Sequence, residues 1–210
     1  MAGSYDFEEQ ERLAELKAWW EDNRWYVLGG IVAAVLAFGG WKAWQAWQAR
    51  QSAEAAALFR PVADEKADPK KAIEAAHAVI AKHPGSYYAS ESALVLARKA
   101  FEAGNHAEAR KHLEWVASKG VEAHRGIAKA RLAAVLMDEK KYDEALKTLD
   151  GINDAAYAAM VADLRGDIML AQGRLDEARA AYKLAAEKAD ARNPLKNIVQ
   201  TKLEALGGAL

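Results

Sequence analysis

Residues 25–47 read WYVLGGIVAAVLAFGGWKAWQAW, and the 17 residues between Arg24 and Lys42 carry no charge. A helix over these residues would be about 25 Å long, slightly less than a hydrocarbon core of about 30 Å. It can extend past Lys42, because a lysine side chain is long enough to reach the membrane surface. The stretch therefore predicts a single membrane-spanning helix.

Tryptophan is concentrated around this stretch, where six of the seven tryptophans lie. Indole rings favour the boundary between membrane and water, so tryptophans at both ends are typical of an interfacial belt. The alternative is a buried helix of a soluble domain, which has no use for such a belt. We assign six residues to the anchor, of which the small ones form a stripe that would allow close packing on another membrane helix: Trp25, Gly29, Ala33, Ala37, Trp41 and Trp44.

Residues 1–24, which precede the span, form a short leader rich in Asp and Glu. Leu13, Leu16 and Trp20 have helical spacing and predict a short amphipathic helix. A secretory signal peptide would need a cationic start and small residues after its apolar core, so an uncleaved anchor is expected. Three basic residues flank the span on each side, so charge leaves its orientation open.

The chain has 210 residues, a formal net charge of -1 and no cysteine. This charge argues against nucleic acid as the main partner, and the lack of cysteine excludes disulfides and thiolate metal sites. The composition is that of an all-α protein. The roughly 155 residues after the anchor are enough for one domain with its own core.

Helix-forming residues continue from Gln45 to Phe59. The spanning helix is therefore expected to extend beyond the membrane until Pro61 ends or bends it. The polar residues 62–69 predict a turn, so 48–69 is assigned as a helical extension and turn.

From residue 70 onward, a short Glu-Ala motif recurs after each predicted turn. Ala109, Ala145 and Ala178 mark three copies, and Ala72 marks a weaker one, at spacings of 37, 36 and 33 residues. Such periods indicate stacked helix–turn–helix units. A small residue would allow two helices to cross closely, and a glycine five residues earlier (Gly104 or Gly173) would end the first helix in a left-handed conformation.

These units resemble tetratricopeptide repeats. The best unit is LRGDIMLAQGRLDEARAAYKLAAEKAD, residues 164–190, in which Gly166, Gly173, Ala178 and Tyr182 fall at the pattern's Gly, Gly, Ala and aromatic positions. The unit with Ala145 has Lys140 at the turn glycine, and Pro84 fits the end of the first unit, which contains Ala72. The fold expected is all-α, with one N-terminal transmembrane helix, a tetratricopeptide-repeat-like α-solenoid over residues 70–210, and a closing helix at 194–206.

A search for catalytic groupings supports a non-enzymatic protein. The sequence contains no H-E-x-x-H, no P-loop and no G-x-G-x-x-G. His77 and His83, and likewise His106 and His112, are six residues apart and would lie on nearly opposite helix faces. We expect no catalytic residue, no metal site and no cofactor.

A curved stack of helix pairs would leave a concave face formed by the first helix of each unit, around residues 87–102, 122–137 and 155–171. Side chains on this face could hold an extended or helical segment of a partner. For each of them, packing within the core is an equally good interpretation. The candidates for the partner face are Tyr87, Tyr88, Arg98, Phe101, Arg131 and Tyr157.

The complete layout resembles the YfgM-like family, which are ancillary subunits of the bacterial SecYEG translocon. The most specific features are the LKAWW leader just before the span and VADLRGD at 161–167. The resemblance implies an inner-membrane protein with a cytoplasmic N-terminus and periplasmic repeats. It also implies association with SecYEG and a membrane-anchored, PpiD-like periplasmic chaperone, with emerging client polypeptides as further partners.

Two functions therefore remain open from the residues. The first is an adaptor that links the translocon to chaperones and assists proteins leaving it. The second is a membrane-anchored scaffold for another machinery of the cell envelope. The anchor and the repeats fit both functions, so only the resemblance favours the first.

Overall fold

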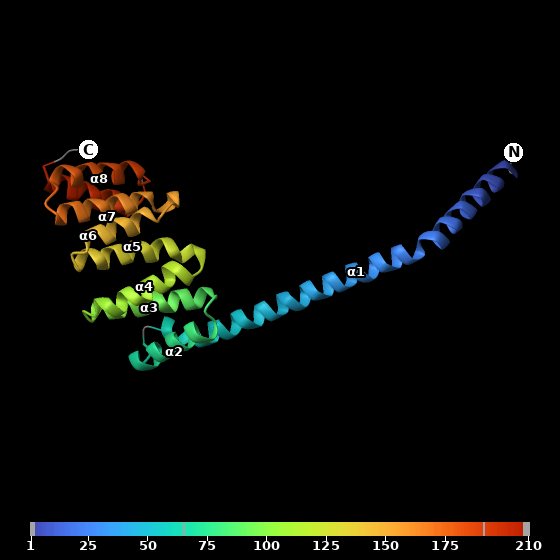
Figure 1. Cartoon of the computed structure of the whole chain (residues 1–210), viewed down its shortest axis with the longest axis horizontal. Coiled ribbons are helices and arrows are strands. Elements are labelled where there is room, and N and C mark those ends of the chain that lie inside the picture. Colours follow the sequence, from blue (N-terminus) through green and yellow to red (C-terminus); the bar gives the residue numbers. More distant parts are fainter. Residues whose placement is uncertain (1–2, 65, 191, 208–210) are drawn as a thin grey trace. The chain divides into compact units, whose positions relative to one another are not determined.

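The computed structural model describes residues 3–64, 66–190 and 192–207 (Figure 1). The remaining residues of the expected leader, turn and C-terminal domain lie outside this description. The chain divides into two compact units, residues 1–51 and 52–210. The elements found in the described ranges are helical, which confirms the all-α prediction.

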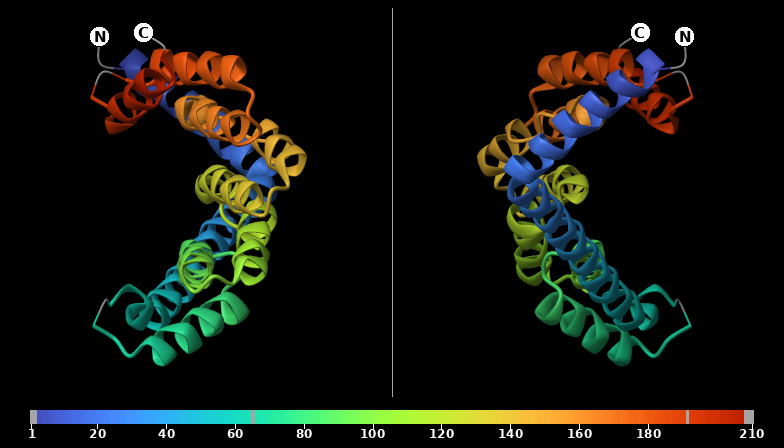
Figure 2. Two further views of the ribbon diagram at one scale, coloured as in Figure 1. Left: turned by 90° about the vertical axis from the view of Figure 1, so that its left-hand side faces the viewer. Right: turned by 90° about the vertical axis from the view of Figure 1, so that its right-hand side faces the viewer.

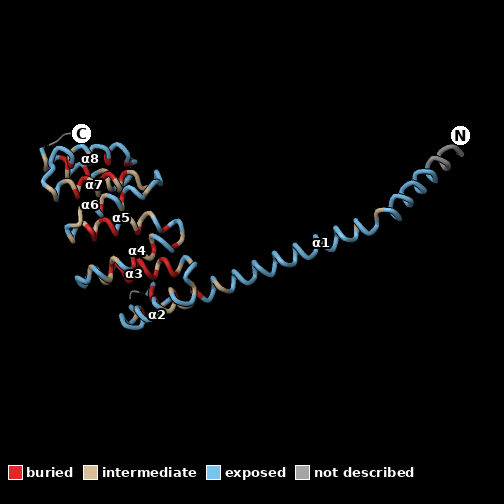
Figure 3. Tube along the Cα trace, viewed as in Figure 1, coloured by how far each residue is buried: buried red, intermediate tan, exposed pale blue. Residues whose placement is uncertain are grey.

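The first helix, α1, runs from Gly3 to Ala63 and contains both the expected leader helix and the expected span. Among the described residues it is the one helix that is long and apolar enough to cross a membrane. Nearly all side chains of its apolar segment are exposed (Figure 3). An apolar surface of this size is unusual on a soluble monomer.

Pro61 lies inside α1, and the helix ends two residues after it, at Ala63. A proline removes one backbone N–H from the helix but does not prevent the last turn from closing. The N–H of Asp64 donates to the carbonyl of Arg60 over 3.1 Å and closes this turn. After a turn, α2 runs from Pro69 to Lys82, and its first N–H groups are capped by the Asp68 carboxylate.

Three helix pairs and a closing helix follow. The pairs are α3 (Tyr87–Glu102) with α4 (His106–Lys119), α5 (Glu122–Asp138) with α6 (Tyr142–Asp150), and α7 (Ala158–Ala171) with α8 (Leu175–Lys188), followed by α9 (Pro194–Ala205). A 3-10 helix, η1 (Ala155–Tyr157), precedes α7. Figure 2 shows these pairs as a curved stack. The predicted helix at 155–171 is thus divided into η1 and α7, and the Asp154 carboxylate caps the start of η1 by accepting the Ala156 N–H at 2.9 Å.

The apolar core consists of three clusters along the stack. The first joins the end of α1 to α2 and α3, through Val62, Ala76 and Leu96. The central cluster joins the four helices α3, α4, α5 and α6, and it includes Ile168 of α7. The third joins α7, α8 and α9, and includes Ala162. Helix α7 therefore contributes to two clusters.

The repeat alanines lie where the helices of a unit pack most closely. Ala109, Ala145 and Ala178 are completely buried, and Ala72 is nearly so. Any larger side chain at these positions would separate the helices or lose its own packing. Pro84 lies just beyond α2, whose C-cap is His83.

The turns of the units depend on a left-handed residue. Gly104 and Gly173 have φ values of 75° and 74°, in agreement with the conformation predicted for them. In the middle unit Lys140 occupies this position, with φ of 59°. A side chain raises the energy of this conformation by about 1–2 kcal/mol, so the second turn is strained.

Replacing Lys140 with glycine should therefore raise the free energy of unfolding by about 0.5–1 kcal/mol. The gain is less than the full strain, because glycine also increases the entropy of the unfolded chain. Urea unfolding of the full chain in detergent, followed by circular dichroism, measures the change. Gly104→Ala introduces the strain elsewhere and should lower stability by a similar amount; a Lys140→Gly variant less stable than the parent would contradict the interpretation.

A polar cluster joins α9 to α7 and α8. The Lys202 ammonium donates to Asp163 Oδ1 at 2.7 Å and to both Asp167 oxygens at 2.7 and 2.9 Å. The Tyr182 hydroxyl donates to Asp167 Oδ1 at 2.7 Å. Burial raises the pKa of Asp163. Burial alone would lower the pKa of Lys202, but its hydrogen bonds to the two carboxylates outweigh this and raise it.

Replacing Lys202 with methionine should lower the free energy of unfolding by about 1–3 kcal/mol. The loss arises because Asp163, only 8% exposed, would keep its charge without a cation. This loss is smaller than the loss from breaking a fully buried ion pair, because the Lys202 side chain is 29% exposed. Thermal unfolding of the full chain provides the measurement, with Lys183→Met, an exposed position on α8, as the control. Adding Asp163→Asn should restore part of the loss, and equal stability of the two methionine variants would contradict the prediction.

Candidate functional site

The first helices of successive pairs form one face of the stack, because α3 packs against α5 and α5 against α7. The residues assigned to the partner face lie on these helices or next to them. Their surroundings differ, and they fall into three groups.

Tyr87 and Tyr88 lie at the start of α3 in an aromatic cluster. The Tyr88 ring packs 5.4 Å from Phe59, and the Tyr87 ring lies 4.6 Å from the ring of His124. His124 is nearly buried, and its Nε2 is 2.9 Å from Glu91 Oε1. The charge of Glu91 raises the pKa of the Tyr87 phenol. Tyr88 thus contributes to packing, whereas Tyr87 remains 54% exposed.

Tyr157 packs against Gly126 of α5. A Cβ atom at Gly126 would lie 2.3 Å from the Tyr157 ring, so the ring occupies the space that a side chain would need. The Tyr157 hydroxyl donates to the Ala123 carbonyl at 3.1 Å. These contacts join η1 to α5, so packing accounts for the position of Tyr157.

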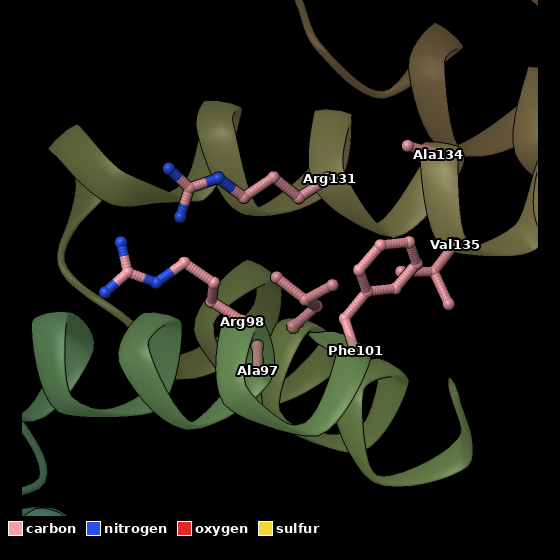
Figure 4. A pocket seen from close by; sticks show the side chains of 7 residues that line it. Ala97, Arg98, Phe101, Arg131, Ala134 and Val135 are labelled. Atoms are coloured by element: carbon pink, nitrogen blue, oxygen red, sulfur yellow. The ribbon is translucent and has the colours of Figure 1, made fainter. Parts of the chain in front are cut away.

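Arg98 and Arg131 line a hollow of about 240 Å3 between α3 and α5. Both side chains extend to the same end of it, and Phe101 lies beside Val135 at the other end (Figure 4). Hereafter this hollow is called the α3–α5 groove. Its lining residues are Ala97, Arg98, Phe101, Leu113, Arg131, Ala134 and Val135.

The two arginines are weakly engaged within the chain. Arg98 Nε is 3.9 Å from Glu102 Oε1, and both side chains are about two-thirds exposed, a pair that contributes little. For Arg131 no ion pair is found in the described parts of the chain. The groove therefore combines two available cations with an apolar wall.

Three further histidines contact neighbouring side chains. His112 Nε2 lies 3.2 Å from Glu108 Oε1, and burial lowers the pKa of this imidazole. The His106 ring meets Phe101 edge-on at 5.2 Å, whereas the His112 ring lies 5.9 Å from His77. Within the described residues, no three His, Cys, Asp or Glu side chains are grouped as metal ligands would be.

Comparison with known proteins shows which family has this arrangement. Residues 17–208 match the family described as tetratricopeptide repeat-like domain. A protein of Neisseria gonorrhoeae named "Ancillary SecYEG translocon subunit" is 31% identical over 204 residues, which are 95% of this chain and 97% of that protein. This chain belongs to the family of ancillary SecYEG translocon subunits. Two further relatives with the same name come from Escherichia coli K12 (30% identity, 94% of this chain and 96% of that protein) and Aggregatibacter actinomycetemcomitans (29%, 97% and 100%).

Membership of this family confirms the resemblance that the leader, the span and the VADLRGD segment predict. The tetratricopeptide-like repeats of an ancillary translocon subunit imply a non-catalytic adaptor. The long apolar α1 fits an inner-membrane protein. The assignments of individual residues to the anchor and to the partner face remain predictions.

Proposed function

We propose that this chain is a membrane-anchored, non-enzymatic adaptor of the SecYEG translocon. The observation that carries the proposal is the similarity to proteins named ancillary SecYEG translocon subunits, which extends from the leader through the repeats. The exposed apolar segment of α1 supports anchoring in a membrane, because it would otherwise face water. The stacked helix pairs support binding to other proteins through the face formed by α3, α5 and α7.

In this proposal, residues 1–24 are the cytoplasmic leader, 25–47 cross the inner membrane, 48–69 form the extension and turn, and 70–210 are periplasmic. The repeats connect the translocon to a membrane-anchored, PpiD-like chaperone and assist polypeptides that leave the translocon. The tryptophans at both ends of the span support its placement, since they would lie at the two membrane surfaces.

Affinity purification tests the partner. The full chain, with a C-terminal tag, is isolated from membranes in mild detergent, and the recovered proteins are identified by mass spectrometry. A single-span protein of the same membrane, carrying the same tag, serves as the control. Translocon subunits should be enriched with this chain only; their absence would contradict the proposed function.

Protease treatment of spheroplasts tests the orientation separately. External protease should digest the repeats and leave a protected fragment that contains the leader and the span. Repeats that survive external protease but are digested after lysis would place them in the cytoplasm, and the orientation would be wrong.

A further inference from the structure

We propose that the α3–α5 groove binds a partner segment that presents an acidic side chain and an apolar side chain on one face. The carboxylate would lie between Arg98 and Arg131, and the apolar side chain would lie against Phe101 and Val135. The inference rests on the proposed function and specifies the chemistry of the partner that the repeats recognise.

The charges at one end of the groove favour an acidic side chain of the partner. Two guanidinium groups reach the same end of the groove (Figure 4), where their like charges repel each other. The residues one turn before and after Arg131 on α5 are Ile127, Ala128, Ala134 and Val135, which offer no counter-charge. A carboxylate at this end would be attracted to both arginines, and the planar donor fork of arginine matches a carboxylate in two hydrogen bonds.

The other end of the groove favours an apolar side chain of the partner. Phe101 is 39% exposed although it is a large apolar residue, while Leu113 and Val135 beside it are buried. The whole groove has a volume of about 240 Å3, less than the ~300–1,000 Å3 of pockets that enclose small-molecule ligands. One apolar side chain of a partner would cover the exposed ring and exclude water from around the nearby ion pairs.

Two other occupants fit less well. A second copy of the chain that used the same face would bring four arginines together, which opposes association. The acidic leader of the same molecule is separated from the repeats by the single span, whichever way the chain crosses the membrane. A segment of a different protein is the occupant that the charges favour.

Peptide binding to the full chain in detergent tests the inference. The probes are fluorescent alanine- and glutamine-based peptides of about 20 residues with both ends blocked, each with one Leu and one Glu, four or seven residues apart and in either order. These spacings place both side chains on one helix face. Matched peptides replace Glu by Gln or Leu by Ser, and one Gln peptide has a free C-terminal carboxylate.

At least one Glu/Leu peptide should bind saturably, and its dissociation constant should rise about tenfold or more when Glu becomes Gln. The double variant Arg98→Gln, Arg131→Gln should weaken the binding of this peptide to the same degree and leave the binding of the Gln peptide unchanged. Phe101→Ala should weaken the binding of the peptides that contain Leu and leave the binding of the Ser peptides unchanged. Lys183→Gln removes an exposed charge from α8 and should have no effect, and circular dichroism verifies that each variant is folded.

The inference is overturned if no Glu/Leu peptide binds below about 1 mM, if the arginine substitutions do not change binding, or if only the free C-terminal carboxylate is bound. The proposed function fails separately, when the unsubstituted chain recovers no translocon subunits from membranes. Recovery of the translocon together with unchanged peptide binding by the arginine variant would reject the groove and retain the adaptor.

Discussion

The Gly166→Ala variant should lose about 2–3 kcal/mol of unfolding free energy. A Cβ atom at Gly166 would lie 2.4 Å from Cε1 of Tyr182, well inside contact distance. The Tyr182 ring is completely buried and its hydroxyl is bonded to Asp167, so the ring has no space into which it can move. Overpacking of this kind costs about 1–3 kcal/mol, and we expect the upper part of that range because the clash is with a fixed ring.

Urea unfolding of the full chain, compared with Gly85→Ala, measures this effect. Gly85 lies in the turn after α2, where a Cβ would meet nothing within 4 Å, so this control should change stability by less than about 0.5 kcal/mol. Combining Gly166→Ala with Tyr182→Leu should recover part of the loss. If Gly166→Ala unfolds at the same urea concentration as the parent, the packing at Gly166 does not limit stability.

Two arginines in the span should abolish membrane integration. Each arginine at the centre of a spanning helix costs about 2.5–3.5 kcal/mol, so Val32→Arg with Leu36→Arg adds about 5–7 kcal/mol. Both positions are exposed and lie near the middle of the uncharged stretch. Alkaline carbonate extraction of membranes distinguishes an integrated chain from a released one.

The matched control places the same two charges outside the span, as Ala14→Arg with Ala18→Arg in the leader. This control should remain in the membrane pellet, while the span variant should appear in the soluble or aggregated fraction. Retention of the span variant in the carbonate-resistant pellet would show that residues 25–47 do not cross the membrane.

The sequence could predict those features that depend on neighbours along the chain. The left-handed turns at Gly104 and Gly173 and the close helix crossing at Ala178 follow from residue type and spacing alone. The substitution of Lys140 for a turn glycine is equally visible, and its positive φ confirms that the turn keeps its conformation.

The candidate site depends on contacts between helices, and the sequence could predict it only in part. Arg98 and Phe101, three residues apart, indicate one helix face, but nothing local shows that Arg131 faces Arg98 across the groove. The contact of Glu91 with His124 joins residues 33 apart, and Gly126 gives no local sign that Tyr157 covers it. The packing of α5 between its neighbours decides which of these side chains remain available.

The three apolar clusters imply that local unfolding is graded along the stack. Opening of α9 and α8 would expose the third cluster and leave the central one largely intact, because α7 is the element that both share. Amide exchange should therefore be faster in α9 than in α5, and Gly166→Ala should widen that difference. A chain frayed at this end would still present the α3–α5 groove, so damage to the closing helix would shorten the protein's lifetime before it impaired binding.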